Sequence, residues 1–363
     1  MATRKDVARA AGVSVASVSR AVNNSGYVKK EVKEHILSVA DSLGYNPNPI
    51  ALSLQSRRTR QLILYLNEIK APYNLQFFNG ATREAYKRGY SVFLDVHCDF
   101  ERIKGYLVDG VLFSLDIVAE KFLNSVGANY HIPVVTVTND ASSALPHPVH
   151  SIVIDNPKVI DTAVDYLISK GHKLIGFILP KRGRDAEMRL KLFKSRMNRE
   201  FKKFGIGLSI DDLIICAEIG DEESGNNIDP PLIFQPSDEQ FEEYSSFKIG
   251  YRAAEHYLDS RNPATAFLCF NDDIGYGFMR GIEKSGLCVP SDISVMGIDG
   301  IYLREWFEKK LTTVSLGAEN LGAVATGALI DLLEGKKPKF LIWSSPALLE
   351  GETVKVIQKE GLS

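Results

Sequence analysis

The sequence predicts a small all-helical head followed by a larger α/β body in a chain of 363 residues. Three short amphipathic segments precede residue 46, and from residue 61 short apolar segments alternate with longer amphipathic ones. Strands that alternate with helices favour parallel, doubly wound sheets with right-handed crossovers. The length of the second part fits two such sheets with a crevice between them, where ligands bind at the carboxyl ends of strands.

The head begins with a helix capped by Thr3, because a hydroxyl followed three residues later by an acid forms a capping box. Ser14 is placed to cap a second helix over 15–23. A third helix is expected over 30–43, with Gly44 as its C-terminal stop. Apolar residues with helical spacing line one face of the third helix: Val32, Ile36, Val39, Ala40 and Leu43.

The second helix and the turn before it fit a DNA-binding helix-turn-helix. In this motif the second helix enters the major groove and its first residues meet base edges. Arginine binds guanine through O6 and N7, and small apolar side chains pack on the thymine methyl group. The predicted base contacts are Val15, Ala16, Ser17 and Arg20, and the predicted phosphate contacts are Thr3, Ser14, Ser19 and Asn23.

Charge separates the head from the body. Residues 1–60 contain ten lysines and arginines against four acidic residues, a net charge of +6, whereas the remainder carries −8. A basic head on an acidic body indicates a polyanionic partner for the head alone. The alternative, a small helical cap that binds no nucleic acid, does not account for this asymmetry.

Residues 46–60 are predicted to be a linker that contains a conditional helix. Pro49 suits the first position of a helix behind Asn48, and 50–56 would supply two turns. An isolated helix of this length is marginal in water, so it needs support from another surface.

The body contains ten predicted strands and at least six predicted helices. The strands are expected at 62–66, 91–96, 110–113, 134–137, 152–154, 174–179, 213–216, 266–269, 294–297 and 313–314, and the helices at 76–88, 157–170, 186–204, 247–260, 274–285 and 318–333. Residues 220–246 interrupt this alternation with eight acids, no lysine or arginine and three prolines. This stretch is expected to be a surface insertion with loop character, and an interaction segment is the alternative.

The cysteines indicate no disulfide frame or zinc site. Cys98, Cys216, Cys269 and Cys288 are far apart and are expected to be reduced, buried thiols. The polar first residues lack a signal-peptide segment, and no apolar run is long enough to span a membrane. A cytoplasmic protein is therefore expected, with no cofactor, no metal and no membrane partner.

Motifs along nearly the whole chain resemble the lactose-repressor/galactose-repressor (LacI/GalR) family of transcriptional regulators. The head carries the family pattern in residues 1–59, and further matches are "VDGVLF" (108–113), "IPVVTV" (132–137), "IVIDN" (152–156), "YLISKGHKLIGFI" (166–178), residues 265–300 and "LTTVSLGAENLG" (311–322). The resemblance implies a body like that of a periplasmic sugar-binding protein, with two subdomains joined by three chain crossings.

For DNA recognition, the resemblance implies that 50–56 is a hinge helix that orders on operator DNA. Leu54 matches a leucine that pairs with its dimer mate and wedges into the central minor-groove step. The pair Val15 and Ala16 implies a palindrome with a central C-G step. Leu52 departs from a frequent arginine, which implies fewer hinge–phosphate contacts.

For a small-molecule effector, Arg189, Asn271 and Asp299 match pocket positions of the family, although the glycine that usually follows the arginine is missing. A forked donor together with amide and carboxylate groups suits vicinal hydroxyls or a carboxylate. Weaker pocket candidates are Asp185, Tyr244, Thr138 and Tyr73. Thr138 stands where sugar-responsive relatives can carry an acid.

The resulting expectation is a homodimeric repressor of palindromic operator DNA whose affinity is switched by a sugar or sugar phosphate. A nucleobase or nucleoside effector, either sign of the switch, and a higher oligomer stay open. The predicted domains are 1–45 for DNA binding, 46–60 for the linker, 61–155 with 316–343 for one effector subdomain, and 156–315 with 344–363 for the other.

An enzyme and a solute-binding protein are the competing classes. The glycines of the "GYGFMRG" stretch (275–281) lie in a predicted helix and lack dinucleotide-loop spacing, and no P-loop or nucleophile elbow occurs. No catalytic residue is therefore assigned. The basic head argues against a pure solute-binding protein.

Overall fold

The computed structural model describes residues 2–23, 26–46, 58–127, 130–141, 145, 149–218 and 246–357. The chain divides into two units, Met1–Arg60 and Gln61–Ser363. The predicted hinge helix 50–56 with Leu52 and Leu54 lies outside the described residues, as do Tyr244 and all of the acidic stretch except Ser246.

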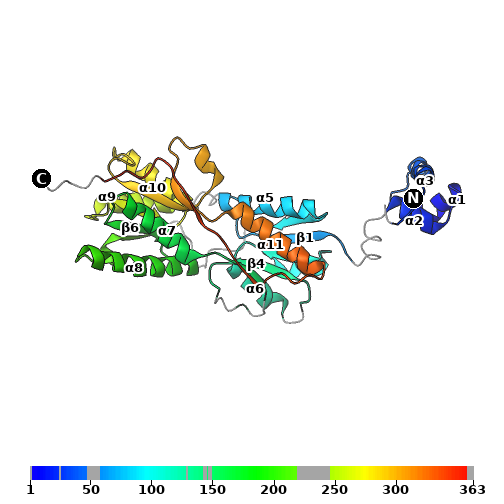
Figure 1. The fold of residues 1–363 in the computed structure, drawn as a ribbon, viewed down its shortest axis with the longest axis horizontal. Helices are drawn as coiled ribbons and strands as arrows, with labels where there is room; N and C mark the ends of the chain where they lie inside the picture. Colours follow the sequence, from blue (N-terminus) through cyan, green and yellow to red (C-terminus); the bar gives the residue numbers. More distant parts are fainter. Residues whose placement is uncertain are drawn as a thin grey trace. The chain divides into compact units, whose positions relative to one another are not determined.

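In its described residues, the head unit has three short helices around one small core (Figure 1). They are α1 (Arg4–Ala10), α2 (Val15–Val22) and α3 (Lys30–Ser42). Val7, Val18 and Ile36 are fully buried where the helices meet. Leu43 was expected to face this core but is 41% exposed, because α3 ends at Ser42 and the chain reverses through Gly44 at φ 59°.

The body contains two sheets of similar winding. In the first, the order is β11-β5-β4-β3-β1-β2 and every pairing is parallel. Its strands are β1 (Gln61–Tyr65), β2 (Ser91–Asp95), β3 (Gly110–Phe113), β4 (Val134–Thr138), β5 (His150–Val153) and β11 (Leu341–Trp343). The helices packed on it are α5 (Pro72–Lys87), α6 (Asp116–Val126) and α11 (Ala318–Leu333).

The second sheet has the order β12-β10-β9-β8-β6-β7, parallel except for the antiparallel edge strand β12. Its strands are β6 (Ile175–Pro180), β7 (Ile214–Ala217), β8 (Ala266–Cys269), β9 (Ser294–Asp299), β10 (Thr312–Ser315) and β12 (Ala347–Leu349). The helices are α7 (Asn156–Ser169), α8 (Arg184–Phe204), α9 (Ser246–Asp259) and α10 (Asp272–Lys284), with short 3-10 turns η1 (Phe100–Gly105), η2 (Ile210–Leu213) and η4 (Tyr302–Glu305).

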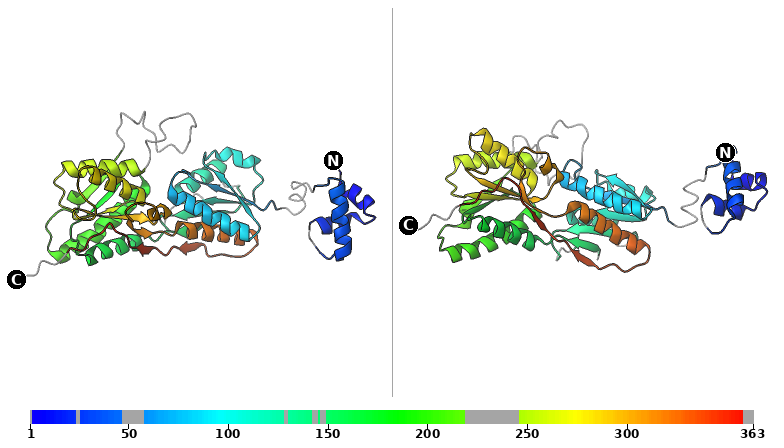
Figure 2. Two further views of the ribbon diagram at one scale, coloured as in Figure 1. Left: turned by 90° about the horizontal axis from the view of Figure 1, so that it is seen from above. Right: turned by 45° about the horizontal axis from the view of Figure 1, so that its top comes forward.

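The order of the strands indicates where a ligand crevice lies. In each sheet the order of strands reverses beside the strand that comes first in the sequence, β1 in one sheet and β6 in the other. Such a reversal opens a crevice at the carboxyl ends of the strands. The described chain passes between the sheets after β5, after β10 and after β11 (Figure 2). This arrangement confirms the predicted two-sheet α/β body.

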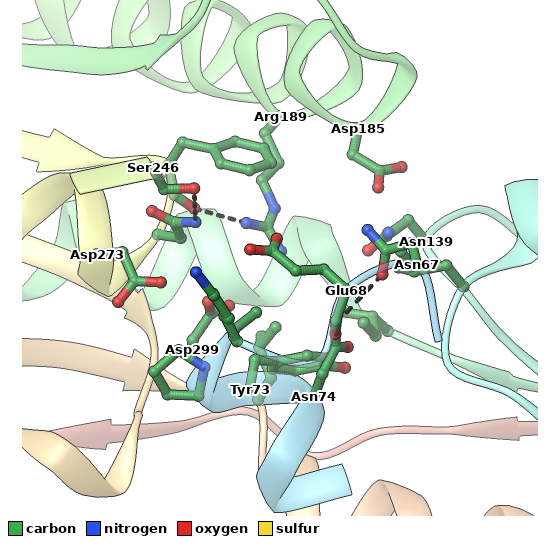
Figure 3. Close-up of a pocket in the computed structure, with 18 of the residues that line it drawn as sticks. Asn67, Glu68, Tyr73, Asn74, Asn139, Asp185, Arg189, Ser246, Asp273 and Asp299 are labelled. Atoms are coloured by element: carbon green, nitrogen blue, oxygen red, sulfur yellow. Dashed lines mark hydrogen bonds between the residues drawn. The ribbon is translucent and has the colours of Figure 1, made fainter. Parts of the chain in front are cut away.

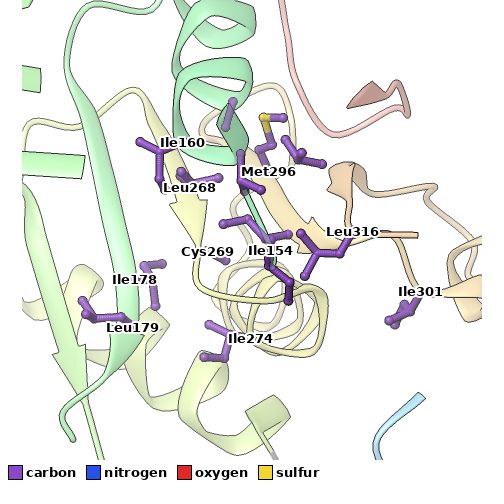
Figure 4. Packing of buried hydrophobic residues seen from close by; sticks show 14 of the residues in the cluster. Ile154, Ile160, Ile178, Leu179, Leu268, Cys269, Ile274, Met296, Ile301 and Leu316 are labelled. Carbon is purple, nitrogen blue, oxygen red and sulfur yellow. The ribbon is translucent and has the colours of Figure 1, made fainter. Parts of the chain in front are cut away.

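One cluster of buried apolar side chains runs through both halves of the body (Figure 4). Ile154 and Leu316, each just after a strand that leads into a crossing, join the side chains of the two sheets there. The central strands β3, β4 and β8 are buried along their whole length. Such continuous burial is typical of parallel strands covered by helices on both faces.

Three elements were not among the predicted helices and strands: α6, β11 and β12. The two strands are three residues long, and their pairing to β5 and β10 depends on chain segments far away in sequence. The prediction of four buried thiols was also wrong, since Cys216 and Cys288 are exposed. In the described part of the chain no helix is long and apolar enough to cross a membrane.

The glycines of the "GYGFMRG" stretch serve helix packing. They lie in α10, which crosses α9 closely. A Cβ on Gly277 would lie 1.9 Å from the carbonyl oxygen of Phe247, and one on Gly250 would lie 2.0 Å from that of Ile274. These glycines therefore let two backbones touch, which agrees with the absence of a dinucleotide-loop spacing.

Candidate functional site

The face of α2 that carries the predicted base contacts points away from the core of the head. Val15, Ala16 and Arg20 are exposed, whereas Val18 and Ala21 are buried. Ala16 and Arg20 are four positions apart, so they share one side of the helix, and Val15 lies beside them at its first turn. Ser17 is partly buried because its hydroxyl pairs with Ser14 at 2.9 Å.

Three of the four predicted phosphate contacts also hold the ends of the helices. Thr3 forms a complete capping box with Asp6 at the start of α1. The Ser14 hydroxyl accepts a hydrogen bond from the Ser17 backbone N–H at 3.1 Å. Asn23, the C-cap of α2, donates through its side chain to Ser19 at 3.3 Å. The same short side chains therefore fix the exposed face of α2 in its helical form.

The body contains a pocket of about 400 Å³, a volume within the range of small-molecule sites (Figure 3). It lies where the carboxyl ends of strands from both sheets face each other. The first half contributes residues after β1, β3, β4 and β5, and the second contributes residues from α8, after β8, at the end of β9 and after β10. The polar lining residues are Asn67, Glu68, Lys70, Tyr73, Asn74, Asn139, Asp185, Arg189, Ser246, Asn271, Asp273 and Asp299.

Arg189 is the best-anchored cation of the pocket, and it is only 4% exposed. Its Nε donates to the side-chain oxygen of Asn156 at 3.0 Å, and one terminal nitrogen donates to the Phe270 carbonyl at 2.7 Å. Its guanidinium also lies over the Phe270 ring, 4.7 Å from the centroid. These contacts hold the guanidinium group of Arg189 at the pocket wall. Among the described residues it has no ion-pair partner.

Asn156 joins the arginine to the opposite half of the body. It is fully buried, and its amide nitrogen donates to both the backbone and side-chain oxygens of Asn139, each at 3.1 Å. Asn139 follows β4 and lines the pocket. The orientation of Arg189 is thereby fixed against both halves.

Asn271 and Asp299 mark the ends of two neighbouring strands of the second sheet. Asn271 caps α10, since its side-chain oxygen accepts from the Ile274 N–H at 2.9 Å, while its amide donates to Ser246 at 3.2 Å. Asp299 has a backbone φ of 127°, a conformation that residues other than glycine rarely adopt. Strain of this kind clusters at ligand sites.

Carboxyl groups crowd this side of the pocket. Buried Asp272 accepts from the Thr313 hydroxyl at 2.5 Å and from the Ile301 N–H at 2.8 Å. Burial raises the pKa of Asp299 well above its usual range, and the charge of Asp272 raises it further while Arg189 opposes the shift. Burial, followed by the charge of Glu68, raises the pKa of Asp273 to about 6.

Two further acids lie on other sides of the pocket. Burial raises the pKa of Asp185, although Arg189 lowers it and Asn139 hydrogen bonds to the carboxylate. Burial likewise raises the pKa of Glu68, against the opposing charge of Lys70. The Tyr73 hydroxyl is buried in the wall and finds no hydrogen-bond partner among the described residues, so it is available to a ligand.

Five of the seven predicted effector residues line this one pocket: Arg189, Asn271, Asp299, Asp185 and Tyr73. Tyr244 lies outside the described residues. Thr138 does not line the pocket, because its buried hydroxyl faces Asp116, whose carboxylate oxygen lies 2.7 Å away, and the Asp140 carbonyl, whose oxygen lies 2.9 Å away. The next residue, Asn139, follows β4 and lines the pocket instead.

Sequence reasoning missed several lining residues, chiefly Glu68, Lys70, Asn139 and Asp273. Position in the sequence could have identified two of them, since Glu68 and Asn139 each come within two residues of the end of a predicted strand. Side chains at carboxyl ends of parallel strands converge on the crevice.

Comparison with known proteins identifies the family of the chain. Residues 3–48 match the family of bacterial regulatory proteins called the lacI family, and residues 222–354 match a periplasmic binding protein-like domain. The chain is 31% identical over 341 residues to the HTH-type transcriptional regulator RegA of Clostridium saccharobutylicum, covering 92% of this chain and 93% of RegA. It is 28% identical to the HTH-type transcriptional repressor PurR of Haemophilus influenzae, over 98% of this chain and 100% of PurR.

The fold is similar to that of a repressor of known structure. The Lac repressor dimer bound to operator and the anti-inducer ONPF superposes with a TM-score of 0.75 at 22% identity, covering 98% of this chain and 99% of that one. The curated relatives are transcriptional regulators, which decides against the enzyme reading. A helix-turn-helix head, a two-sheet body with a pocket between its halves, and 31% identity along almost the whole chain together make this protein a member of the lacI family of bacterial transcriptional regulators.

Proposed function

We propose that this protein is a cytoplasmic, homodimeric repressor that binds a palindromic operator and releases or tightens its hold when a small carbohydrate enters the pocket of the body. The observation that carries the effector assignment is the convergence of Arg189, Asn271 and Asp299 on one pocket between the two sheets. A fixed guanidinium fork, an amide and a carboxylate match the alternating donors and acceptors of vicinal hydroxyls. The aromatic side chains of Tyr73, Phe247 and Phe270 add apolar surface for the ring of a sugar.

The proposed DNA contacts rest on the exposed face of α2 and on the charge of the head. Val15, Ala16, Ser17 and Arg20 would read base edges, and Thr3, Ser14, Ser19 and Asn23 would contact phosphates. Leu54 would wedge into the centre of the operator as part of the hinge helix. A helix-turn-helix dimer reads two half-sites, which requires a palindrome.

The switch would act through the two halves of the body, for which we propose the subdomains 61–155 with 316–343 and 156–315 with 344–363. The pocket takes side chains from both halves, so a ligand that contacts both favours their closed arrangement. Ligand can change operator affinity only if it binds the two arrangements with different affinity. The arrangement of the halves would then decide whether the hinge helices of a dimer meet over the operator.

The test is fluorescence anisotropy of a labelled palindromic duplex with a central C-G step, with a scrambled duplex as control. Salt-sensitive binding that prefers the palindrome and that one sugar shifts would support the proposal and give the sign of the switch. The effector panel includes purine bases, and a response to these alone would replace the carbohydrate by a nucleobase.

Two variants separate base reading from phosphate contact. Arg20→Ala should weaken palindrome binding by about 1–3 kcal/mol and reduce the preference over scrambled DNA. Ser19→Ala should weaken binding to both duplexes about equally. Equal loss on both duplexes for Arg20→Ala would show that this arginine contacts phosphate rather than a base.

A further inference from the structure

Two carboxylates that have no hydrogen-bond or ion-pair partner among the described residues face the pocket from opposite halves of the body. Glu68 stands in the loop after β1, and Asp273 stands in the first turn of α10 (Figure 3). Neither side chain forms a hydrogen bond or ion pair within the described residues, in contrast to neighbouring Asp272. The charge of Glu68 contributes to the raised pKa of Asp273, so the two groups interact across the pocket.

The described lining of the pocket is acidic. Four carboxylates, from Glu68, Asp185, Asp273 and Asp299, line the described part of it against two cations, Lys70 and Arg189. One cation is already engaged with fixed partners, because Arg189 donates to Asn156 and to the Phe270 carbonyl. The charge of Lys70 acts on Glu68, whereas the charged group that shifts the pKa of Asp273 is Glu68, a like charge.

An ionised carboxylate can only accept hydrogen bonds, so it requires a donor from the ligand. Sugar hydroxyls supply such donors, whereas a phosphate ester brings further negative charge and only acceptor oxygens near neutral pH. Burial weakens the screening of like charges by water, which strengthens this discrimination.

We propose that Glu68 and Asp273 form an acidic pair that selects an unphosphorylated sugar, whose hydroxyl groups bridge the two halves of the body, and that excludes sugar phosphates. This inference rests on the proposed role of the pocket as the effector site. It narrows the proposed effectors to sugars that carry no phosphate group. Ligand hydroxyl groups that donate to both carboxylates would also hold the two halves of the body together.

The first test is calorimetric titration of the full chain with matched pairs of compounds. The pairs are glucose, galactose, mannose and ribose, each with its terminal phosphate ester. The expected result is that a bound sugar prefers its unphosphorylated form by at least tenfold, and that the double variant Glu68→Gln, Asp273→Asn reduces this preference by at least tenfold. Glu187→Gln, an exposed carboxylate of α8 outside the pocket lining, is the matched control and should leave the preference unchanged.

The outcomes are distinguishable. Tighter binding of a phosphate ester by the unaltered protein would overturn the acidic-pair inference while leaving a carbohydrate effector in place. No binding by any of the compounds, with operator binding intact, would overturn the carbohydrate effector itself and this inference with it.

A second measurement needs no ligand. Carbon-detected NMR titration of the aspartate carboxyl groups should show the pKa of Asp273 falling when Glu68 is replaced by Gln, and staying in place in Glu187→Gln. An unchanged Asp273 titration in Glu68→Gln would show that the two carboxylates do not interact and would also overturn the inference. Operator binding of each variant confirms that it folds.

Discussion

At the scale of single residues, Asp299 combines two unfavourable features at the position where a ligand is expected. Its φ of 127° strains the backbone, and its carboxyl group is buried beside Asp272. Strain of this kind costs about 1–3 kcal/mol and persists only when the surrounding structure holds it. The combination is expected of a residue kept for binding rather than for stability.

Replacing Asp299 by glycine should therefore stabilise the body and abolish effector binding. Glycine relieves the backbone strain and removes the buried charge, against an entropic cost of about 0.5–1 kcal/mol in the unfolded chain. The expected net gain is about 1 kcal/mol in urea unfolding, with effector affinity reduced more than tenfold in calorimetry. Asp299→Asn removes the charge but keeps the backbone strain. A similar gain in stability in that variant would show that the buried charge, and not the strain, destabilises the parent protein.

Asp273 makes stability depend on pH. Its pKa of about 6 in the folded protein lies above the ordinary value of 3.8, so the folded state holds its proton more tightly than the unfolded state. The stability from this group is complete below about pH 4 and is lost as the pH rises through about 6. Asp273→Asn should accordingly be more stable than the parent by roughly 2 kcal/mol at pH 8 and about equal to it at pH 4. Thermal unfolding at the two pH values measures the difference, and an equal effect at both would contradict the titration.

At the scale of elements, the crossing of α9 and α10 depends on glycine. Gly250 and Gly277 occupy positions where any Cβ would meet backbone atoms of the other helix. On helix propensity alone, alanine at Gly277 would stabilise α10 by about 1 kcal/mol. Packing predicts that the same substitution destabilises the protein, because the backbone atoms that the new Cβ would meet cannot move aside as a flexible side chain does.

Gly277→Ala should destabilise the body by about 2 kcal/mol or more, measured as a lower midpoint of urea unfolding. Gly207→Ala is the matched control, since a Cβ there meets no atom within 4 Å and its φ is not positive. A stabilised Gly277→Ala protein would mean that the two helices move apart without loss.

At the scale of the whole body, polar contacts among the described residues join the two halves near the pocket. Gln76 of α5 accepts from the Tyr302 N–H at 2.9 Å and donates to the Gly300 carbonyl at 3.5 Å. Arg184 of α8 pairs with Glu120 of α6 at 2.8 Å. Both contacts connect walls that also supply pocket residues, so they favour the arrangement in which the pocket is lined from both sides.

Gln76→Ala should weaken effector binding about three- to tenfold without loss of the fold, because the halves lose two hydrogen bonds that hold them together. Calorimetry on the variant measures the affinity, and thermal unfolding checks the fold. Glu120→Gln should have a smaller effect that disappears at high salt, since this ion pair is partly exposed. Unchanged affinity in Gln76→Ala would mean that the crossings alone set the arrangement.

Local rules were enough to predict the head and the alternation of the body. Thr3 and Ser14 cap their helices as the capping rules require, and β3, β8 and α11 begin and end where the apolar pattern predicted. These features depend on residues within one or two turns or along one strand. Strands as short as β11 and β12 carry too little pattern of their own, so their pairing could not be predicted.

The sequence by itself determined the class of the protein, through a capped helix-turn-helix, a basic head and motifs shared along the body. It also named five residues of the pocket, three of which, Arg189, Asn271 and Asp299, match pocket positions of the resembled family. Only the tertiary structure decided that Thr138 turns to Asp116 while Asn139 faces the pocket, and that Glu68 and Asp273 line the same pocket from opposite halves. The physical reason is that these relations join segments up to 205 residues apart in sequence, and only the packing of the two sheets sets which side chains share the space between them.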